Sequence, residues 1–277
     1  MIFDVAADVI ANTRLSTDYN VIALAAPELA RAAAPGQFVM IRLTSGHDPL
    51  LRRPFSIFEI LRDGDRPIGV SLLNKRVGVG TRLLYDARPG DRMACLGPLG
   101  QPFPPVNPPE DAWMVAGGVG LAPFVTLAEA LAARGTSSTL FYGGRASADL
   151  FREDIFERLG VRLVLTTEDG SRGEHGRVTA PLTRALADRP ADRPVTLYAC
   201  GPTPMMRAVA DLGRRFRRPT FVSLEPVMGC GMGGCYSCVV PVRRSPEDAA
   251  SHFVRSCLAG PVFDAGLVAW DSLRGGH

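Results

Sequence analysis

Apolar and polar residues alternate over short stretches in the N-terminal part of the chain. Runs such as DVIANTRL, GQFVMIRL and IGVSLLNK are bounded by Gly, Pro, Asp and Asn, which is typical of strands in an antiparallel sheet. One short helix is expected here, over TRLLYD after Gly80. The pattern therefore predicts an antiparallel β-barrel for residues 1–104.

A proline-rich segment, QPFPPVNPPE, occupies residues 101–110 and marks a domain boundary, because proline lacks the amide hydrogen that helices and sheets need. Beyond it, strand-like and helix-like runs alternate, as in AWMVAGG followed by APFVTLAEALAARG. Such alternation predicts a Rossmann-like parallel α/β sheet for residues 105–224. Residues 225–277 contain no long periodic segment, and we expect them to form a small third module.

Composition narrows the range of partners. The net charge is +3, and no long block of like charges suggests a nucleic-acid surface or a membrane anchor. Asp4 and Asp8 stand where a signal peptide would need positive charge, and GGVG and Pro123 interrupt the longest uncharged stretch, residues 112–128. We therefore expect a cytoplasmic protein without nucleic-acid or membrane partners, whose cysteines are metal ligands or free thiols.

Four cysteines have the spacing of an iron–sulfur site. Cys230, Cys235 and Cys238 form C-x4-C-x2-C, and Cys257 follows after 18 further residues, which is the plant-type [2Fe–2S] pattern. The glycines between the cysteines allow positive φ angles and bring backbone N–H groups close to the sulfurs. A structural zinc site is the alternative, although zinc knuckles usually supply cysteines in two close pairs and Cys257 stands alone.

Glycine-rich turns provide candidate nucleotide sites. GGVGLAP (residues 117–123) lies between a predicted strand and a predicted helix, where a dinucleotide pyrophosphate binds, and CGPTPMM (residues 200–206) repeats this geometry. In the first domain, VGVGT (residues 77–81) opens the short helix and offers backbone N–H groups to a phosphate, while RRPFSI (residues 52–57) begins a strand. In the polar segment 166–176, Glu168 or Asp169 is a candidate acceptor for ribose hydroxyls.

In this order, the motifs resemble those of the ferredoxin–NADP reductase superfamily and, within it, the electron transfer subunits of class 1B dihydroorotate dehydrogenases. The resemblance covers nearly the whole chain, and SLEPVMGCGMGGCYSCVV followed by VRSCLAGPVF is its most discriminating part. It implies FAD, NAD(H) and a [2Fe–2S] cluster as cofactors. The implied residues are Arg53, Pro54, Phe55, Ser56, Leu73, Asn74, Lys75, Gly80 and Thr81 for FAD; Gly117, Gly118, Gly120, Cys200, Gly201 and Pro202 for NAD(H); and Cys230, Cys235, Cys238 and Cys257 for the cluster. Asn74 and Lys75 replace a Tyr-Arg pair that is usual in this subfamily.

The three cofactors imply an order of electron transfer. NADH delivers two electrons together as hydride, whereas the cluster accepts one at a time, so a flavin must stand between them. The resemblance further implies that electrons pass to FMN in a separate dihydroorotate dehydrogenase catalytic subunit of pyrimidine biosynthesis, within a heterotetramer of two chains of each kind. We predict that apolar residues around the cysteine loop (residues 229–238) face that subunit, namely Met228, Met232 and Tyr236.

Two alternatives remain open at this stage. The chain could be the small flavin and [2Fe–2S] subunit of an NADPH-dependent ferredoxin oxidoreductase or a sulfide dehydrogenase, because their motifs are similar. It could also be a non-catalytic zinc-binding adaptor that retains a reductase fold.

Overall fold

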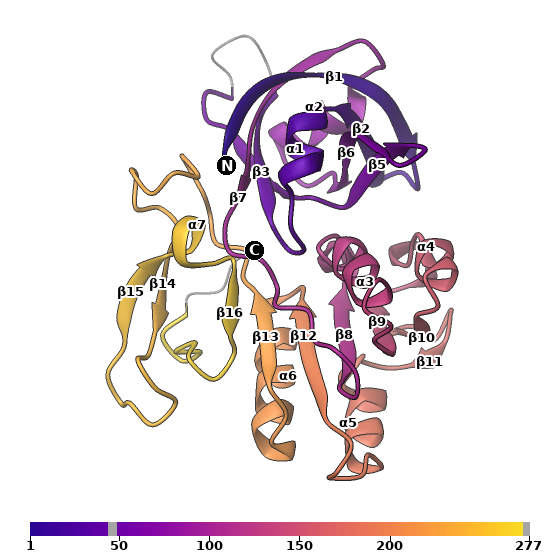
Figure 1. The fold of residues 1–277 in the computed structure, drawn as a ribbon, viewed down its shortest axis with the longest axis vertical. Helices are drawn as coiled ribbons and strands as arrows, with labels where there is room; N and C mark the ends of the chain where they lie inside the picture. Colours follow the sequence, from indigo (N-terminus) through magenta and orange to yellow (C-terminus); the bar gives the residue numbers. More distant parts are fainter. Residues whose placement is uncertain (44–48, 274–277) are drawn as a thin grey trace.

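The computed structural model describes residues 1–43 and 49–273. A barrel lies above an α/β domain, and a smaller module that carries the cysteines lies beside both (Figure 1). The predicted barrel and parallel-rich sheet are thus confirmed. Within the described residues, no helix has the length and the apolar character needed to cross a bilayer.

The barrel is a seven-stranded antiparallel sheet with the order β4-β3-β7-β1-β2-β6-β5. Alternate residues of its strands face the interior, so that Ile22 and Leu24 of β2 are fully buried. Its elements are β1 (Phe3–Arg14), β2 (Tyr19–Ala25), α1 (Pro27–Ala32), β3 (Phe38–Arg42), β4 (Arg53–Ser56), β5 (Glu59–Asp63), β6 (Arg66–Lys75), α2 (Val79–Asp86) and β7 (Arg92–Leu99). Helix α2 was predicted; α1 was not, because so short a helix leaves no visible helical periodicity.

The α/β domain is built on a second seven-stranded sheet with the order β11-β10-β9-β8-β12-β13-β16, in which only β16 runs antiparallel to its neighbour. Its elements are β8 (Asp111–Gly117), α3 (Phe124–Ala132), β9 (Ser138–Gly144), α4 (Glu153–Arg158), β10 (Arg162–Thr167), β11 (Glu174–His175), α5 (Thr179–Ala187), β12 (Val195–Cys200), α6 (Thr203–Phe216) and β13 (Thr220–Ser223), with 3₁₀ turns over Gly118–Leu121 and Ser147–Asp149. Met114 packs toward α3 and α4, whereas its neighbour Val115 packs toward α5 and α6.

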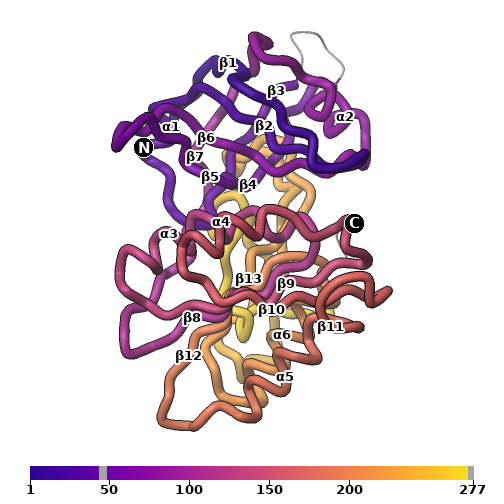
Figure 2. The backbone as a smooth tube through the Cα atoms, turned by 90° about the vertical axis from the view of Figure 1, so that its right-hand side faces the viewer, coloured from indigo at the N-terminus to yellow at the C-terminus, as the bar shows by residue number. Residues whose placement is uncertain are grey.

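The order of the parallel strands creates a crevice for ligands. From β8 the chain proceeds through β9 and β10 to one side, and then returns to place β12 and β13 on the other side. The loops after β8 and β12 therefore diverge at a topological switch point, where open α/β sheets bind ligands. The carboxyl ends of β8, β12 and β13 point toward the barrel (Figures 1 and 2).

The cysteine-bearing module contacts both larger units. It contains β14 (Val239–Val242), β15 (His252–Arg255), α7 (Ser256–Ala259) and β16 (Val262–Asp264). Strand β16 pairs with β13 and so extends the α/β sheet. On the other side, Met228, Cys238 and Cys257 form a small buried cluster with Phe38 and Met40 of the barrel.

Candidate functional site

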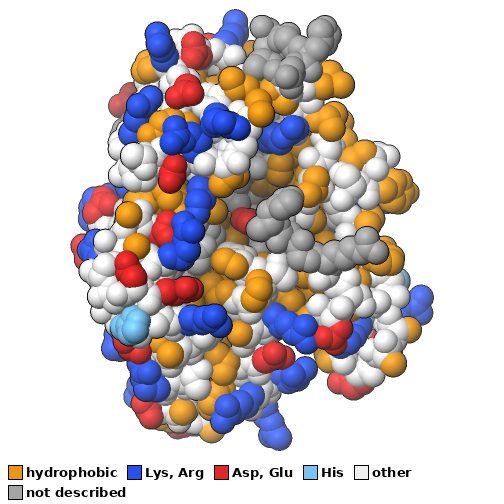
Figure 3. Space-filling view, turned by 180° about the vertical axis from the view of Figure 1, so that it is seen from behind, with side chains coloured by type: hydrophobic (Ala, Val, Ile, Leu, Met, Phe, Trp, Pro, Cys, Tyr) orange, Lys and Arg blue, Asp and Glu red, His pale blue; other side chains and the backbone are white. Residues whose placement is uncertain are grey.

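A cleft of about 1070 Å³ lies where the barrel, the α/β domain and the cysteine-bearing module meet. This volume lies at the upper end of the range of small-molecule pockets, so the cleft has room for more than one ligand. Figure 3 shows this face hollowed between the barrel and the α/β domain, with Lys and Arg side chains along one rim.

The barrel wall of the cleft carries most of the residues that were predicted for FAD. Those that line the cleft are Pro54, Phe55, Ser56, Leu73, Asn74, Lys75 and Thr81. Arg53 and Gly80 are not among the residues that line the cleft. The Arg53 side chain donates to the carbonyl of Leu51 at 2.8 Å, and Gly80 packs so closely that an added Cβ would lie 2.8 Å from Leu43.

Asn74 and Thr81 shape the entrance of helix α2. The buried Asn74 amide nitrogen donates to Asn20 Oδ1 at 2.7 Å and to the Thr81 carbonyl at 3.0 Å, while Asn74 Oδ1 has no partner among the described residues. The Thr81 hydroxyl accepts hydrogen bonds from the backbone N–H groups of Val77 and Gly78, each at 2.8 Å. An orphaned oxygen and an ordered helix N-terminus beside the cleft fit a bound flavin nucleotide.

The nucleotide wall is formed by the loops after β8 and β12. Gly117, Gly118, Gly201 and Pro202 line the cleft. Gly120, in contrast, is buried against the other loop, where a Cβ would overlap the carbonyl oxygen of Cys200. This glycine therefore allows the two loops to approach, and Cys200 itself is fully buried behind the lining.

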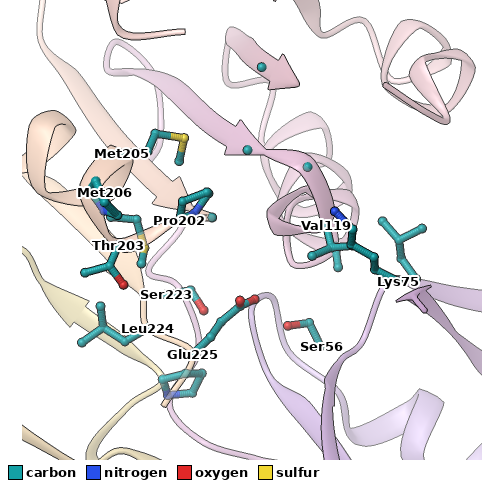
Figure 4. A pocket seen from close by; sticks show the side chains of 18 of the residues that line it. Ser56, Lys75, Val119, Pro202, Thr203, Met205, Met206, Ser223, Leu224 and Glu225 are labelled. Atoms are coloured by element: carbon teal, nitrogen blue, oxygen red, sulfur yellow. The ribbon is translucent and has the colours of Figure 1, made fainter. Parts of the chain in front are cut away.

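Glu225 was missed by the sequence analysis and occupies the centre of the cleft. Its carboxylate extends into the cleft from one side and Ser56 faces it from the barrel, while Ser223 and Leu224 lie nearby (Figure 4). Glu225 Oε1 lies 3.8 Å from Cys200 Sγ. The surrounding protein desolvates both groups, which raises the pKa of the Glu225 carboxyl and that of the Cys200 thiol.

The far end of the cleft lies at the carboxyl ends of β9 and β10. Arg145, Thr166, Glu168 and Arg177 line it, and the buried Thr166 hydroxyl has no partner among the described residues. Asp169 does not line the cleft; its carboxylate accepts from the backbone and the hydroxyl of Ser171, which lowers the pKa of Asp169. Of the two predicted ribose acceptors, Glu168 is the one that faces the cleft.

The cysteine loop has the geometry that its glycines suggested. Gly231 and Gly233 have φ angles of +73° and +81°, and the Met232 N–H donates to Cys230 Sγ at 3.4 Å. Cys238 and Cys257 are each 2% exposed, whereas Cys235 is exposed. Met228 is also buried, so it cannot belong to the predicted docking surface, while Met232 and Tyr236 are 60% and 61% exposed.

Contacts within the cysteine loop and with Cys257 shift the pKa values of two of the four thiols. Hydrogen bonds from Ser237, and then from Cys230, lower the pKa of Cys235 to about 6, while burial and then contact with Cys238 raise the pKa of Cys257 to about 12. Among the described residues, no three His, Cys, Asp or Glu side chains converge on one ion. A two-iron cluster, in which each iron takes two thiolates, fits this arrangement better than a tetrahedral zinc ion, which needs four ligands around one centre.

The cysteine loop is also part of the cleft wall. Ser237 lines the cleft, and its hydroxyl lies 3.2 Å from Cys235 Sγ. Phe38 lines the cleft too and packs in the buried cluster that contains Cys238 and Cys257. Side chains in direct contact therefore connect the predicted flavin site with the predicted cluster site.

Comparison with known proteins places this geometry in a family. Residues 114–211 match the oxidoreductase NAD-binding domain, and residues 225–269 match the iron-sulfur cluster binding domain of dihydroorotate dehydrogenase B. The dihydroorotate dehydrogenase B (NAD(+)) electron transfer subunit of Desulforamulus reducens is 38% identical, with 89% of this chain and 90% of that protein covered. The same subunit of Geobacillus kaustophilus is 42% identical, with 84% and 86% covered.

Solved structures show similar folds. A chain of an NADH-dependent reduced ferredoxin–NADP oxidoreductase, studied for flavin-based electron bifurcation, superposes with a TM-score of 0.83 at 30% identity and covers 96% of this chain and 91% of that one. The Amycolatopsis cytochrome P450 reductase GcoB gives a TM-score of 0.63 at 27% identity, with 78% and 67% covered.

Proposed function

The chain belongs to the family of dihydroorotate dehydrogenase B electron transfer subunits, and from this premise we propose how it works. It carries electrons between NAD(H) and the FMN of a separate catalytic subunit, through FAD and a [2Fe–2S] cluster, for de novo pyrimidine biosynthesis. The observation that carries the proposal is the single cleft whose walls include the flavin motifs, the nucleotide loops and the cysteine loop. The cytoplasmic location expected from the sequence and the heterotetramer implied by the family resemblance belong to this proposal.

We propose the following division of the chain. Residues 1–104 hold FAD, with Pro54, Phe55 and Ser56 against the ring system and the start of α2 at the phosphates. The position of these residues on the cleft wall and the unpaired Asn74 Oδ1 atom support this part of the proposal. Residues 105–224 hold NAD(H) at the loops after β8 and β12. Residues 225–277 hold the cluster through Cys230, Cys235, Cys238 and Cys257.

The protein supplies position and environment for chemistry that the cofactors perform. When bound, FAD accepts an electron pair from NADH and releases the electrons singly to the cluster. Ser56 and Glu225 face each other across the cleft, so they limit the space and the water between a flavin and a nicotinamide. Desolvation by the surrounding protein raises the pKa of the Glu225 carboxyl, which favours its protonated form at this point of the cleft.

The proposal is tested by comparing the purified chain with its complex. The chain alone should oxidise NADH with an artificial electron acceptor and show no dihydroorotate oxidation. Addition of the dihydroorotate dehydrogenase catalytic subunit should produce dihydroorotate oxidation coupled to NAD⁺ reduction. The alternative is a subunit of an NADPH-dependent ferredoxin oxidoreductase, and one similar structure comes from an NADH-dependent reduced ferredoxin–NADP oxidoreductase. It would be favoured if the chain formed no complex with the catalytic subunit and instead supported electron transfer between NADPH and ferredoxin with a larger flavin partner.

A further inference from the structure

A buried carboxylate joins the two walls of the cofactor cleft at a point that no sequence motif marked. Asp149 is 8% exposed and lies in the 3₁₀ turn that follows β9. Its Oδ1 accepts a hydrogen bond from the Tyr19 hydroxyl of barrel strand β2 at 2.8 Å. Its Oδ2 accepts from the Nε and the backbone N–H of Arg145, each at 3.2 Å. All three residues line the cleft.

Tyr19 is held firmly at the junction of the two domains. It is 3% exposed, and its ring centroid lies 4.5 Å from that of Phe151 in the α/β domain. The ammonium group of Lys75, a residue of the predicted FAD site, lies 5.0 Å from the centroid of the same ring. A shift of Tyr19 would therefore move part of the barrel wall.

Arg145 extends from the same carboxylate toward the nucleotide end of the cleft. Its side chain is 74% exposed and lies beside the carboxyl end of β9, so its positive charge is available to a phosphate or ribose. The Asp149 carboxylate is ionised in this setting. Burial opposes its charge, but hydrogen bonds from Tyr19 and Arg145 outweigh that cost and hold the pKa of Asp149 below its usual value.

We propose that Asp149 is a positioning residue for hydride transfer, with a separate task for each oxygen. Through Oδ2 it directs Arg145 at the bound nucleotide, and through Oδ1 it fixes the barrel wall, and with it the flavin, relative to the nucleotide domain. The inference rests on the proposed function, because it assumes that NAD(H) and FAD occupy the two ends of this cleft.

The two tasks can be separated by substitution. Asp149→Asn keeps a carbonyl oxygen that can accept from Tyr19 but removes the negative charge that faces Arg145. Tyr19→Phe removes the link to the barrel and leaves the pair of Asp149 and Arg145 in place. Arg145→Gln removes the cation at an exposed position, where a failure to fold is not expected.

The experiment uses the chain loaded with FAD and cluster, and measures two quantities for each variant. Calorimetry gives the dissociation constant of ADP-ribose, which binds without any hydride transfer. Stopped-flow absorbance gives the rate of flavin bleaching at saturating NADH. Asp149→Asn and Arg145→Gln should raise the dissociation constant about two- to fivefold, the range for a partly exposed ion pair.

Tyr19→Phe should behave in the opposite way. The dissociation constant of ADP-ribose should stay at its wild-type value, while the bleaching rate should fall by about tenfold, because small errors in the position of reacting groups cost large factors in rate. Tyr85→Phe is the matched control. The Tyr85 hydroxyl donates to the carbonyl of Ser16 at 2.8 Å within the barrel, and neither residue lines the cleft.

An unchanged dissociation constant in Asp149→Asn, or a wild-type bleaching rate in Tyr19→Phe, would overturn the assignment. If Tyr85→Phe lowered the bleaching rate as much as Tyr19→Phe, the effect would come from general loosening of the barrel, and the assignment would be overturned as well. If wild-type flavin is not bleached by NADH at all, the proposed function fails instead, and the ADP-ribose comparison still tests the link between Asp149 and Arg145.

Discussion

Gly231 provides a sharp test of how the cysteine loop is anchored. Its φ angle is +73°, and a Cβ added there would lie 2.5 Å from Cγ of Met40 and 3.1 Å from Cδ1 of Leu99. Met40 is completely buried, so its side chain has no free space into which it can retreat. Substitution of Gly231 by alanine therefore combines a strained backbone with an overpacked interior.

The expected cost follows from these two contributions. A left-handed conformation costs an L-residue about 1–2 kcal/mol, and overpacking of a buried site costs about 1–3 kcal/mol. Together they amount to about 2–5 kcal/mol, a large part of the stability of a domain. The strain acts within the loop that supplies Cys230, so the loss should appear first as loss of the cluster.

The assay is iron and acid-labile sulfide per chain, together with the melting temperature. Gly231→Ala should lose most of its iron and melt roughly 5–10 °C lower than wild type. Gly234→Ala is the matched control on the same loop, because Gly234 has no positive φ and nothing lies within 4 Å of its added Cβ. Wild-type iron content in Gly231→Ala, or equal damage in Gly234→Ala, would show that close packing of Gly231 does not hold the cysteine loop in place.

Three further predictions concern the other parts of the site. Cys257→Ser should lose the cluster iron but retain most of its FAD, since the proposal makes Cys257 a cluster ligand and this residue does not line the cleft. Undiminished iron, measured by metal analysis, would remove Cys257 from the proposed ligand set. Gly120→Ala should weaken ADP-ribose binding roughly tenfold or more in calorimetry, because the new Cβ drives the loops after β8 and β12 apart; unchanged affinity would contradict the close packing against Cys200. Glu225→Gln should flatten the pH dependence of the free energy of unfolding, measured by urea titration. The raised pKa means that the folded chain keeps this proton to higher pH than the unfolded chain, so wild-type stability falls as the pH rises through that range. An identical fall in the variant would mean that another group is responsible.

Features that depend on local sequence were predictable from the chain alone. The spacing of the four cysteines, the glycine turns after two strands and the alternation that gives the barrel and the α/β sheet are all short-range patterns. The lining of the cleft by Ser56, Asn74 and Gly118 agrees with the motifs that contain these residues. A motif marks a backbone shape, however, and does not say which member faces the cleft: Gly120 and Arg53, both predicted for a cofactor, are not among the residues that line it.

Features that depend on contacts between distant segments could not be found in this way. Asp149 and Tyr19 are 130 residues apart, and neither stands in a recognisable pattern. Glu225 lies next to the cysteine motif in sequence, but its place in the cleft beside Cys200 depends on the fold. Burial of Met228 against Phe38 likewise depends on how the module packs against the barrel, and for this reason its prediction as a docking residue was wrong.

The spectrum of the purified chain shows whether one cleft connects NADH, flavin and cluster. Iron, acid-labile sulfide and FAD should be measured on an anaerobic sample, and NADH then added in the same cuvette. We expect about two irons, two sulfides and one FAD per chain, with flavin absorbance that falls on addition of NADH. A colourless protein that contains zinc and no sulfide would contradict it.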